Sequence, residues 1–390
     1  MGKRVGMEVS IAAAEAVKQA NVDVISAYPI TPQTHIVEHL SEIVANGELD
    51  AEFFCVESEH SALSVCVGAA ATGARTFTCT SSQGLALMSE ITYIASGLRL
   101  PMLMIISNRT LSAPLSIWND HSDTMSIRDC GWIQFFVENG QEVYDHVFVS
   151  YRLGEDRQVL FPVIVNMDGF ILSHVIEPIE LIEQEKIDRF LPPYEPLHQL
   201  HPDHPITMGA FALPSIFAEA KKAQEEALLS SMPKIIETWK AFGDMTGRYY
   251  HPVETYKAED ADTLLITMGS CSETASVAVD KMREEGRSVG LVKLRLWRPF
   301  PFDDLKKATL HAKQLVVIDR AISVGACGPV ASEVKAALYG KDQRPAIYNF
   351  VAGISGRDVT PSDFVKMVDK AEIEIEEGNK EGYEIYGVRG

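Results

Sequence analysis

The sequence has no CxxC pair and no other grouping of cysteines, although it contains six of them in 390 residues. Iron–sulfur clusters are held by grouped thiolates, so we expect no cluster on this chain. Isolated cysteines in apolar segments usually pack as small apolar side chains in a reducing compartment. The chain is therefore expected to be cytoplasmic, with the single cysteines at Cys55, Cys66, Cys79, Cys130, Cys271 and Cys327.

Long apolar runs and an excess of positive charge are lacking as well. No apolar stretch reaches the roughly 18 residues of a membrane span. Glu8 and Glu15 interrupt the Ala-rich start, which argues against a signal peptide. The 54 acidic residues outnumber the 35 basic ones and give a formal net charge of -19. Nucleic acid is excluded as a partner because phosphate backbones bind through Lys and Arg.

The pattern of apolar segments predicts an α/β protein with two parallel-sheet domains. A chain of this length exceeds one ordinary domain. Short apolar runs alternate with helical patterns over residues 7–167, and the same alternation resumes near residue 260. Strands are expected at 22–27, 51–56, 75–80, 101–107, 132–137, 161–166, 263–268, 289–294, 315–319 and 346–351. Helices are expected at 7–20, 33–45, 59–72, 85–96, 124–129, 142–153 and 272–285.

The segment between these two units is less regular and rich in proline at 191–205. A helical pattern over about 215–242 should break or kink at Pro233, since proline disrupts a helix interior. We therefore expect a first domain over 1–190, a linker with helices over 191–254, a second domain over 255–370 and a peripheral acidic tail over 371–390.

Ligands of parallel sheets bind at the carboxyl ends of the strands, so the loops there are the first candidates for a site. Glu57 and Glu59 stand where an apolar strand turns into a small-residue helix, and either capping or a functional carboxylate explains them about equally well. Thr31 lies in the proline-bounded loop YPITP at 28–32, which could bind a small ligand or form an ordinary turn. Arg109 follows a very apolar strand and suits either bidentate carboxylate recognition or a structural salt bridge.

Three further patterns have a structural interpretation that we favour. The DHSD run at 120–123 resembles a metal-ligand cluster, but Asp and Ser are also good helix caps. His198, His201 and His204 are interrupted by prolines and indicate a solvated loop rather than a metal site. The glycine-rich segment 323–334 lacks a full nucleotide fingerprint and favours close helix–strand packing over phosphate binding.

Taken together, several motifs closely resemble the pyruvate:ferredoxin oxidoreductase family. YPITP (28–32), VESEHSA (56–62), TSSQGLALM (80–88) and NRTLSAPLSIWNDHSDTMSIRD (108–129) match its pyrimidine-binding domain in order and spacing. The resemblance continues through DHPITMG (203–209), MGSCSETA (268–275) and LRLWRPFP (294–301), and so covers nearly the whole chain. It implies a thiamine-diphosphate pyrimidine-binding domain followed by a domain similar to the C-terminal domain of transketolase.

The resemblance also implies roles for particular residues. Glu59 looks like the glutamate that hydrogen-bonds N1′ of the thiamine aminopyrimidine, with Glu57 as its competitor. Arg109 resembles the arginine that binds the substrate carboxylate, and Thr31 matches the threonine that hydrogen-bonds the oxoacid. Tyr28 and Ile117 are expected to line the same pocket.

By the same resemblance, the chain is the α subunit of an enzyme that converts pyruvate to acetyl-CoA and CO2, with coenzyme A as co-substrate and ferredoxin as electron acceptor. Neither Asp168-Gly169 nor the segment 242–245 supplies the GDG motif that holds the diphosphate. The diphosphate and Mg²⁺ are therefore expected on a β subunit, and [4Fe-4S] clusters on ferredoxin-like γ and δ subunits, within a dimer of hetero-oligomers. The alternatives are a sister enzyme for branched-chain 2-oxoacids, 2-oxoglutarate or oxalate, and a non-catalytic assembly subunit.

Overall fold

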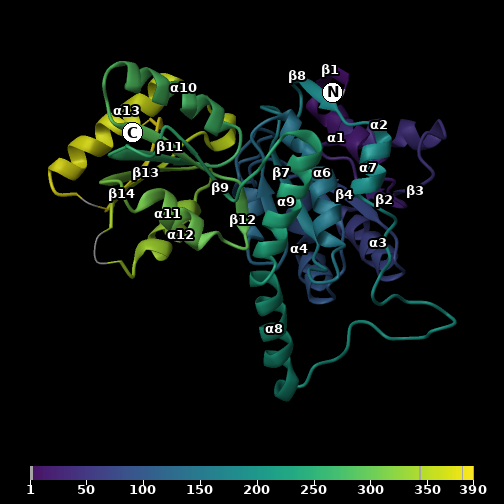
Figure 1. Cartoon of the computed structure of the whole chain (residues 1–390). Coiled ribbons are helices and arrows are strands. Elements are labelled where there is room, and N and C mark those ends of the chain that lie inside the picture. Colours follow the sequence, from purple (N-terminus) through teal and green to yellow (C-terminus); the bar gives the residue numbers. More distant parts are fainter. Residues whose placement is uncertain (1–2, 342–343, 380, 390) are drawn as a thin grey trace.

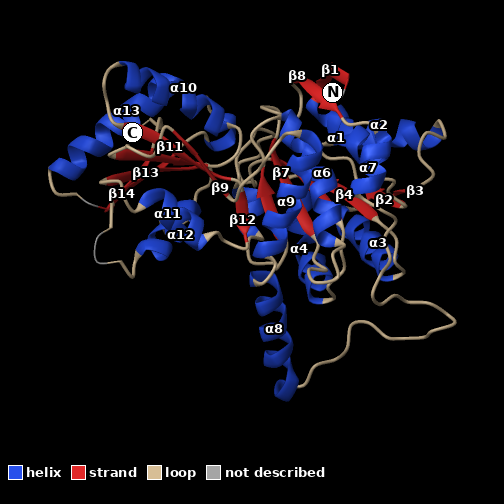
Figure 2. Cartoon of the chain, viewed as in Figure 1, coloured by secondary structure: helices blue, strands red, loops and turns tan. Residues whose placement is uncertain are grey.

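The computed structural model describes residues 3–341, 344–379 and 381–389. It shows two α/β bodies side by side, each with strands between helices (Figures 1 and 2). Two separate sheets of mainly parallel strands are present, which confirms the predicted fold class. Among the described residues, no helix combines the length and the apolarity needed to cross a membrane.

The first sheet has seven strands in the order β12-β6-β7-β5-β4-β2-β3. All neighbours are parallel except β12, which pairs antiparallel with β6 at one edge. The central strands are buried on both faces, as expected for a parallel sheet. The bounds are β2 Val24–Ala27, β3 Glu52–Cys55, β4 Thr76–Thr80, β5 Leu103–Asn108, β6 Ile133–Phe136, β7 Val163–Asp168 and β12 Leu296–Arg298.

Helices cover both faces of this sheet. One apolar cluster joins the sheet to α1, α2 and α6, and another joins it to α3 and α4. The bounds are α1 Val9–Gln19, α2 Thr34–Ala45, α3 Glu59–Ala71, α4 Ser82–Gly97, α5 Ser122–Ser126, α6 Gly140–Gly154 and α7 Gln184–Phe190. A separate antiparallel pair, β1 Lys3–Glu8 and β8 Ile176–Leu181, lies beside them.

The second sheet has six strands in the order β15-β14-β13-β10-β11-β9, and only β9 runs antiparallel to its neighbour. Helices α10 and α13 cover one face and α11 and α12 the other. The strands are β9 Val253–Tyr256, β10 Thr263–Thr267, β11 Val289–Leu294, β13 Gln314–Asp319, β14 Ala346–Val351 and β15 Glu381–Ile385. The helices are α10 Cys271–Glu284, α11 Phe302–Thr309, α12 Pro329–Leu338, the 3-10 turn η1 Ile354–Gly356 and α13 Pro361–Glu376.

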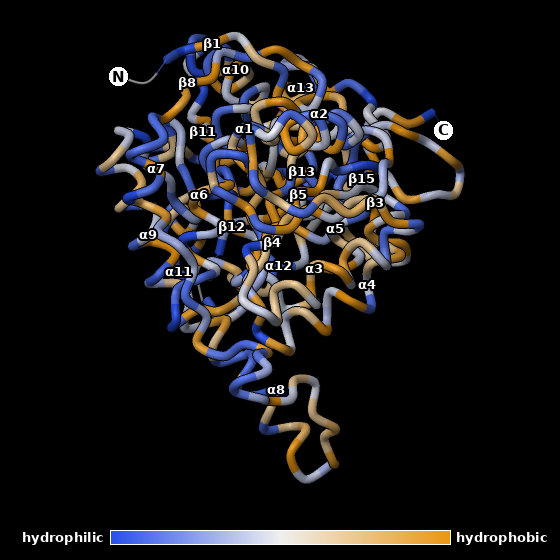
Figure 3. The backbone as a smooth tube through the Cα atoms, turned by 90° about the vertical axis from the view of Figure 1, so that its right-hand side faces the viewer, coloured by the Kyte–Doolittle hydropathy of each residue, from blue (hydrophilic) through white to orange (hydrophobic). Residues whose placement is uncertain are grey.

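Two helices lie along the chain between the first and the second domain, and they differ in how they pack. Helix α8 (Pro214–Leu229) projects away from the body, and Leu228 is its buried residue. The projecting part of the chain around α8 carries both hydrophobic and hydrophilic residues (Figure 3). Helix α9 (Met232–Thr246) follows after a break at 230–231, with Pro233 in its first turn. Its Trp239 and Phe242 are buried in the core of the first domain.

The structure departs from the sequence-based expectations in three places. Residues 371–390 were expected to form a peripheral tail, but they include the end of α13 and the edge strand β15. Helix α9, expected in a linker, packs on α6. Strands β1, β8, β9 and β12 were not expected. They are short, and each pairs with a segment that is distant in sequence or at a sheet edge, so they leave little local periodicity.

Candidate active site

Loops from neighbouring parallel strands meet at the carboxyl edge of the first sheet. Strands β2, β3, β4 and β5 lie side by side and point the same way. The loops after β2 and β5 carry Thr31 and Arg109, and the first turns of the helices after β3 and β4 carry Glu59 and Gly84. The structure therefore brings the residues selected from sequence to one edge of one sheet, where ligands of such sheets bind.

Glu59 is the first residue of α3, at the end of β3. Ser58 is the N-cap and its hydroxyl accepts a hydrogen bond from the Ser61 amide, so the cap of this helix does not need Glu59. The Glu59 side chain is only 8% exposed. Within the part of the chain that the structure describes, its carboxylate makes no hydrogen bond or ion pair. A buried acid without a partner is costly and calls for a ligand that supplies one.

The Glu59 carboxylate lies against the first turn of α4. A Cβ atom added to Gly84 would stand 2.8 Å from Cγ and Oε1 of Glu59 and 2.4 Å from Oγ1 of Thr80. Only a glycine therefore leaves room for both groups at this position. Oγ1 of Thr80 is itself buried without a hydrogen-bond partner among the described residues. The Glu59 carboxylate and the Thr80 hydroxyl, both without partners within the described residues, thus lie next to the space that the missing side chain of Gly84 leaves.

Glu57, the competing carboxylate, lies in a different environment. It is exposed, and the Ser61 hydroxyl donates a hydrogen bond to it. That hydrogen bond lowers the pKa of the Glu57 carboxyl from its ordinary value. Glu57 is therefore a solvated and already partnered acid, unlike Glu59.

Arg109 follows β5 and is only 7% exposed. Its Nε donates to the carbonyl oxygen of Ser116 (2.9 Å), and its Nη1 donates to the carbonyl oxygen of Thr31 (2.9 Å). No carboxylate among the described residues forms an ion pair with it, so a structural salt bridge does not explain it. Burial lowers the pKa of the Arg109 guanidinium and the Asp123 charge opposes this, but an arginine stays charged. Nη2 makes no hydrogen bond within the described chain.

Asp123, part of the DHSD run, joins two of these loops. Its carboxylate accepts hydrogen bonds from the amides of Ser82 (3.1 Å) and Arg109 (2.9 Å) and from the Asn108 side chain (2.9 Å). Burial raises the pKa of Asp123 to about 6, and these donors counteract the rise. The start of α4 and the start of the arginine loop are therefore held by one carboxylate.

The remaining predicted residues lie at the surface of this edge. Thr31 is exposed, and its carbonyl is the group that contacts Arg109. Tyr28 and Ile117 are 38% and 41% exposed. Below the loop, the Gln33 side chain donates to the Tyr28 carbonyl (2.9 Å) and fixes its course. Thr31 and Arg109 are thus brought together directly, while Tyr28 and Ile117 remain open to a partner or ligand.

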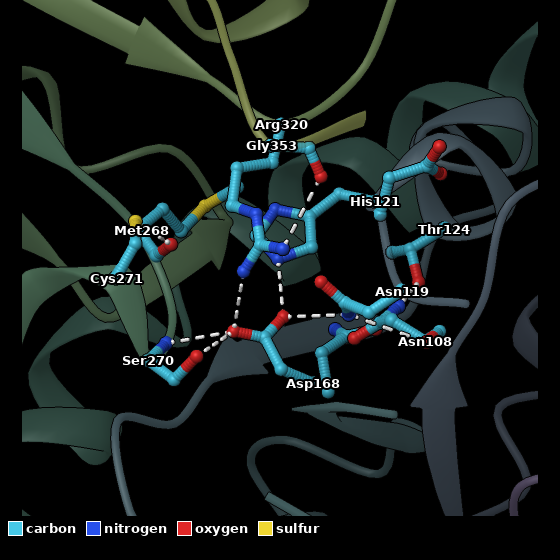
Figure 4. A network of polar contacts seen from close by, with 12 residues as sticks. Asn108, Asn119, His121, Thr124, Asp168, Met268, Ser270, Cys271, Arg320 and Gly353 are labelled. Atoms are coloured by element: carbon cyan, nitrogen blue, oxygen red, sulfur yellow. Dashed lines mark hydrogen bonds and ion pairs between the residues drawn. The ribbon is translucent and has the colours of Figure 1, made fainter. Parts of the chain in front are cut away.

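A second network connects this edge with the second domain (Figure 4). Asp168, the last residue of β7, is buried and accepts hydrogen bonds from Asn119 (3.0 Å) and from Ser270 of the second domain (2.9 Å). It also contacts His121 (2.7 Å) and forms an ion pair with Arg320 (3.1 Å). Burial would raise the pKa of the Asp168 carboxyl, but Arg320 and His121 outweigh it and hold that pKa well below its usual range.

The patterns for which we favoured structural interpretations have structural partners. Asp120 accepts from the Ser122 amide (2.9 Å), as a loop-bracing residue does. A Cβ on Gly328 would stand 2.0 Å from the Asp319 carboxylate, which caps α12 and would repel a phosphate there. No group of three or more potential metal ligands occurs among the described residues, including the histidines at His198, His201 and His204.

Sequence reasoning missed the contacts that connect the domains. Ser116 and Ser270 lie in the family motifs and Asp168 was considered for a GDG motif, but the contacts of these residues with Arg320 and Ser355 could not be predicted, because the partners lie up to 239 residues apart. Asp123 lay in a run that was noticed, but its partners Ser82 and Arg109 could not be read from spacing.

Family models match both parts of the chain. Residues 15–240 match the model described as pyruvate flavodoxin/ferredoxin oxidoreductase, thiamine diphosphate-binding. Residues 261–364 match the model described as pyruvate:ferredoxin oxidoreductase core domain II.

Individual proteins are similar over almost the whole chain. Pyruvate synthase subunit PorA of Pyrococcus furiosus is 47% identical over 96% of this chain and 95% of its own length. Ketoisovalerate oxidoreductase subunit VorA of Pyrococcus horikoshii is 44% identical over 94% of this chain and 93% of its own length. The 2-oxoglutarate:ferredoxin oxidoreductase of Magnetococcus marinus, solved with 2-oxoglutarate, coenzyme A and succinyl-CoA, has a TM-score of 0.71 at 19% identity. That match covers 95% of this chain and 65% of the other. A split-gene transketolase matches with a TM-score of 0.56 at 12% identity, over 94% of this chain and 98% of the transketolase chain. The two structural matches show a shared fold.

Proposed function

The chain belongs to the pyruvate flavodoxin/ferredoxin oxidoreductase family, and on that premise we propose that it is the α subunit of a cytoplasmic pyruvate:ferredoxin oxidoreductase. The complex oxidatively decarboxylates pyruvate to acetyl-CoA and CO2 and passes the electrons to ferredoxin. The likeness to a pyruvate synthase subunit along nearly the whole chain carries this proposal.

The site around Glu59 fits the aminopyrimidine half of thiamine diphosphate. A buried carboxylate without a protein partner, beside the space left by Gly84, suits a hydrogen bond from N1′ of that ring. By accepting this hydrogen bond, the Glu59 carboxylate would favour the tautomer that carries the ring proton on N1′, so that the exocyclic nitrogen could act as a base. When bound, the cofactor would supply a nucleophilic carbon that adds to the oxoacid and a cationic ring that takes up the electron pair left by the departing CO2.

The substrate would be held at the same sheet edge, by the loops that follow β2 and β5. Arg109 is fixed by two backbone carbonyls and presents Nη2, which suits the carboxylate shared by all 2-oxoacids. Thr31 would offer its exposed hydroxyl to the oxoacid, with Tyr28 and Ile117 lining the pocket. An arginine held in this way orients the acid without moving, which is the main contribution of a positioning group.

Partner chains would complete the site. The described residues present no metal-ligand group and the sequence has no GDG motif, so the diphosphate and Mg²⁺ are assigned to a β subunit. The scattered free cysteines leave the [4Fe-4S] clusters to ferredoxin-like γ and δ subunits. The incomplete site makes a dimer of hetero-oligomers the assembly that we propose.

A panel of substrates tests the proposal. The native complex, purified through a tag on this chain, is assayed for coenzyme-A-dependent viologen reduction with pyruvate, 2-oxoisovalerate, 2-oxoglutarate and oxalate. We expect pyruvate to give the highest kcat/KM. A preference for 2-oxoisovalerate would favour the sister activity suggested by the VorA likeness. Absence of reduction with every oxoacid would contradict the proposal altogether.

A further inference from the structure

The turn after β14 in the second domain lies directly on the loop that carries the arginine site in the first. This turn is η1, and its Ser355 and Gly356 contact the stretch 116–121. We propose that Ser355 is a positioning residue for substrate binding, because it fixes the loop that orients Arg109. The inference rests on the proposed function, since it concerns the same site.

The contact between the two domains runs through Ser116. Its Oγ accepts a hydrogen bond from the Ser355 hydroxyl at 2.5 Å, while its carbonyl oxygen accepts the Nε–H of Arg109 at 2.9 Å. The amide of Trp118 also donates to the Ser116 hydroxyl (3.3 Å). Ser116 thus contacts the second domain through its side chain and the Arg109 guanidinium through its backbone carbonyl.

The next residues of the loop are fixed by the same domain. The Gly356 amide donates to the Asn119 carbonyl at 2.5 Å, and the Ser355 amide donates to the Asp120 carboxylate at 3.3 Å. The His121 amide donates to the Arg320 carbonyl at 2.7 Å. Every residue from 119 to 121 therefore has a partner on the second domain.

The turn itself is shaped for this contact. Ser355 has a φ of 53°, a left-handed conformation that is unfavourable for a residue with a side chain. Gly356 has a φ of 71°, and a Cβ there would stand 2.7 Å from the Cβ of Trp118. A glycine is required for so close an approach. Backbone strain of this kind persists where the surrounding contacts demand it.

The outer part of the loop, residues 111–118, needs this support because most of its residues are exposed and its internal backbone hydrogen bond runs from the Thr110 amide to the Trp118 carbonyl at 3.0 Å. It contains no helix or strand between the end of β5 and the start of α5. Leu115, Ile117 and Trp118 are 77%, 41% and 51% exposed. Loops with few buried contacts open locally at low cost. The hydrogen bonds from η1 and Arg320 therefore set the position of the Ser116 carbonyl, and through it the guanidinium of Arg109.

The test uses the assembled complex carrying Ser355→Ala in this chain. We expect the KM for pyruvate to rise about five-fold, the effect of one lost neutral hydrogen bond. The kcat and the KM for coenzyme A should stay unchanged. Ser276→Ala is the matched control, because that hydroxyl only bonds its own helix in the second domain. Hydrogen exchange of the loop peptide 110–121 should be faster in Ser355→Ala than in the control. A merely structural role would not produce this selective change.

Ser116→Ala removes the same bond from the other side and decides the question if Ser355→Ala does not assemble. Ser116→Ala also loses the hydrogen bond from the Trp118 amide, so in the double variant we expect no rise in KM beyond that of Ser116→Ala alone. Unchanged loop exchange together with an unchanged pyruvate KM in either single variant would overturn the inference. A wild-type complex that does not oxidise any 2-oxoacid would instead contradict the proposed function. The exchange measurement would still decide whether Ser355 fixes the loop.

Discussion

Asp168 at the end of β7 and Arg320 at the end of β13 form a buried ion pair at 3.1 Å that joins the two domains. Both side chains are nearly excluded from solvent, at 1% and 5% exposure. The same carboxylate accepts the Ser270 amide, so three distant segments converge on one charge. The site loop 109–121 reaches this point through Asn119 and His121. The arrangement of the two domains and the position of the loop 109–121 therefore depend on the same carboxylate.

Removing the arginine of this pair should destabilise the chain strongly. In Arg320→Met the Asp168 carboxylate stays buried without its arginine partner. Breaking a buried ion pair in this way lowers the free energy of unfolding by about 3–5 kcal/mol. Thermal unfolding of the complex should show a clearly lower transition for this variant. The double variant Asp168→Asn/Arg320→Met removes both charges but keeps a side-chain oxygen that can accept from Ser270 or Asn119, and it should recover part of the loss. Equal melting temperatures for wild type and Arg320→Met would contradict the role of the pair.

The contribution of Asp168 should not change over the physiological pH range. Burial acts to raise the pKa of its carboxyl, but Arg320 and His121 hold that pKa well below its ordinary value. A carboxyl with a depressed folded-state pKa contributes its full stability above the unfolded pKa of about 4, and loses it only at lower pH. The difference in unfolding temperature between wild type and Asp168→Asn should therefore be the same at pH 5.5 and pH 8. A difference that shrinks steadily from pH 8 to pH 5.5 would count against this.

Glu59→Gln should abolish most of the activity while the complex still assembles. An amide at this position cannot hold the proton of N1′ as a carboxylate does, and we expect a loss of about 10²–10⁴-fold in kcat, the range for a lost acid–base group. Glu57→Gln is the matched control, because that acid is exposed and bonded to Ser61. Size-exclusion chromatography checks assembly and viologen reduction checks activity. Near-normal activity of Glu59→Gln would favour a non-catalytic assembly subunit.

Gly84→Ala should weaken cofactor binding by displacing the Glu59 carboxylate. The added Cβ would lie 2.8 Å from Oε1 of Glu59, closer than ordinary contacts allow. Gly97→Ala at the other end of α4 is the control, since its Cβ would meet nothing within 4 Å. We expect a higher apparent Kd for thiamine diphosphate in the complex with Gly84→Ala only. The same Kd in both variants would show that the pyrimidine does not depend on this position of Glu59.

Arg109 should determine the affinity for the 2-oxoacid. Arg109→Ala is expected to raise the KM for pyruvate by about 10- to 100-fold, the loss of one charge-assisted interaction. Arg109→Lys should behave similarly, because a lysine cannot donate to the carbonyls of Thr31 and Ser116 and to an anion in a fixed fork. Arg99→Lys is the control, since Arg99 also donates to backbone carbonyls but precedes β5. Unchanged steady-state kinetics of Arg109→Ala over a pyruvate titration would rule out this role.

The fold was predictable because its signals are local. Apolar runs with helical patterns between them indicated the parallel strands of both sheets, and parallel strands place their carboxyl ends at one edge. The positions of Thr31, Glu59 and Arg109 near that edge follow from this rule alone. Short strands such as β12 escaped prediction, because antiparallel pairing with β6 connects residues more than 150 positions apart.

The sequence by itself determined the two α/β units, the sheet edge that carries the candidate residues and the family motifs along it. The register of the SEHSA motif already favoured Glu59 over Glu57, but only the tertiary structure shows that Glu59 is buried and Glu57 exposed, since burial depends on what packs above a helix start. The tertiary structure also shows that Arg109 donates to two backbone carbonyls and forms no ion pair with a carboxylate among the described residues. It further shows that Asp168 pairs with Arg320 of the other domain. Periodicity records which side of an element is buried. Which side chains meet there depends on the packing of segments that the chain brings together only when it folds.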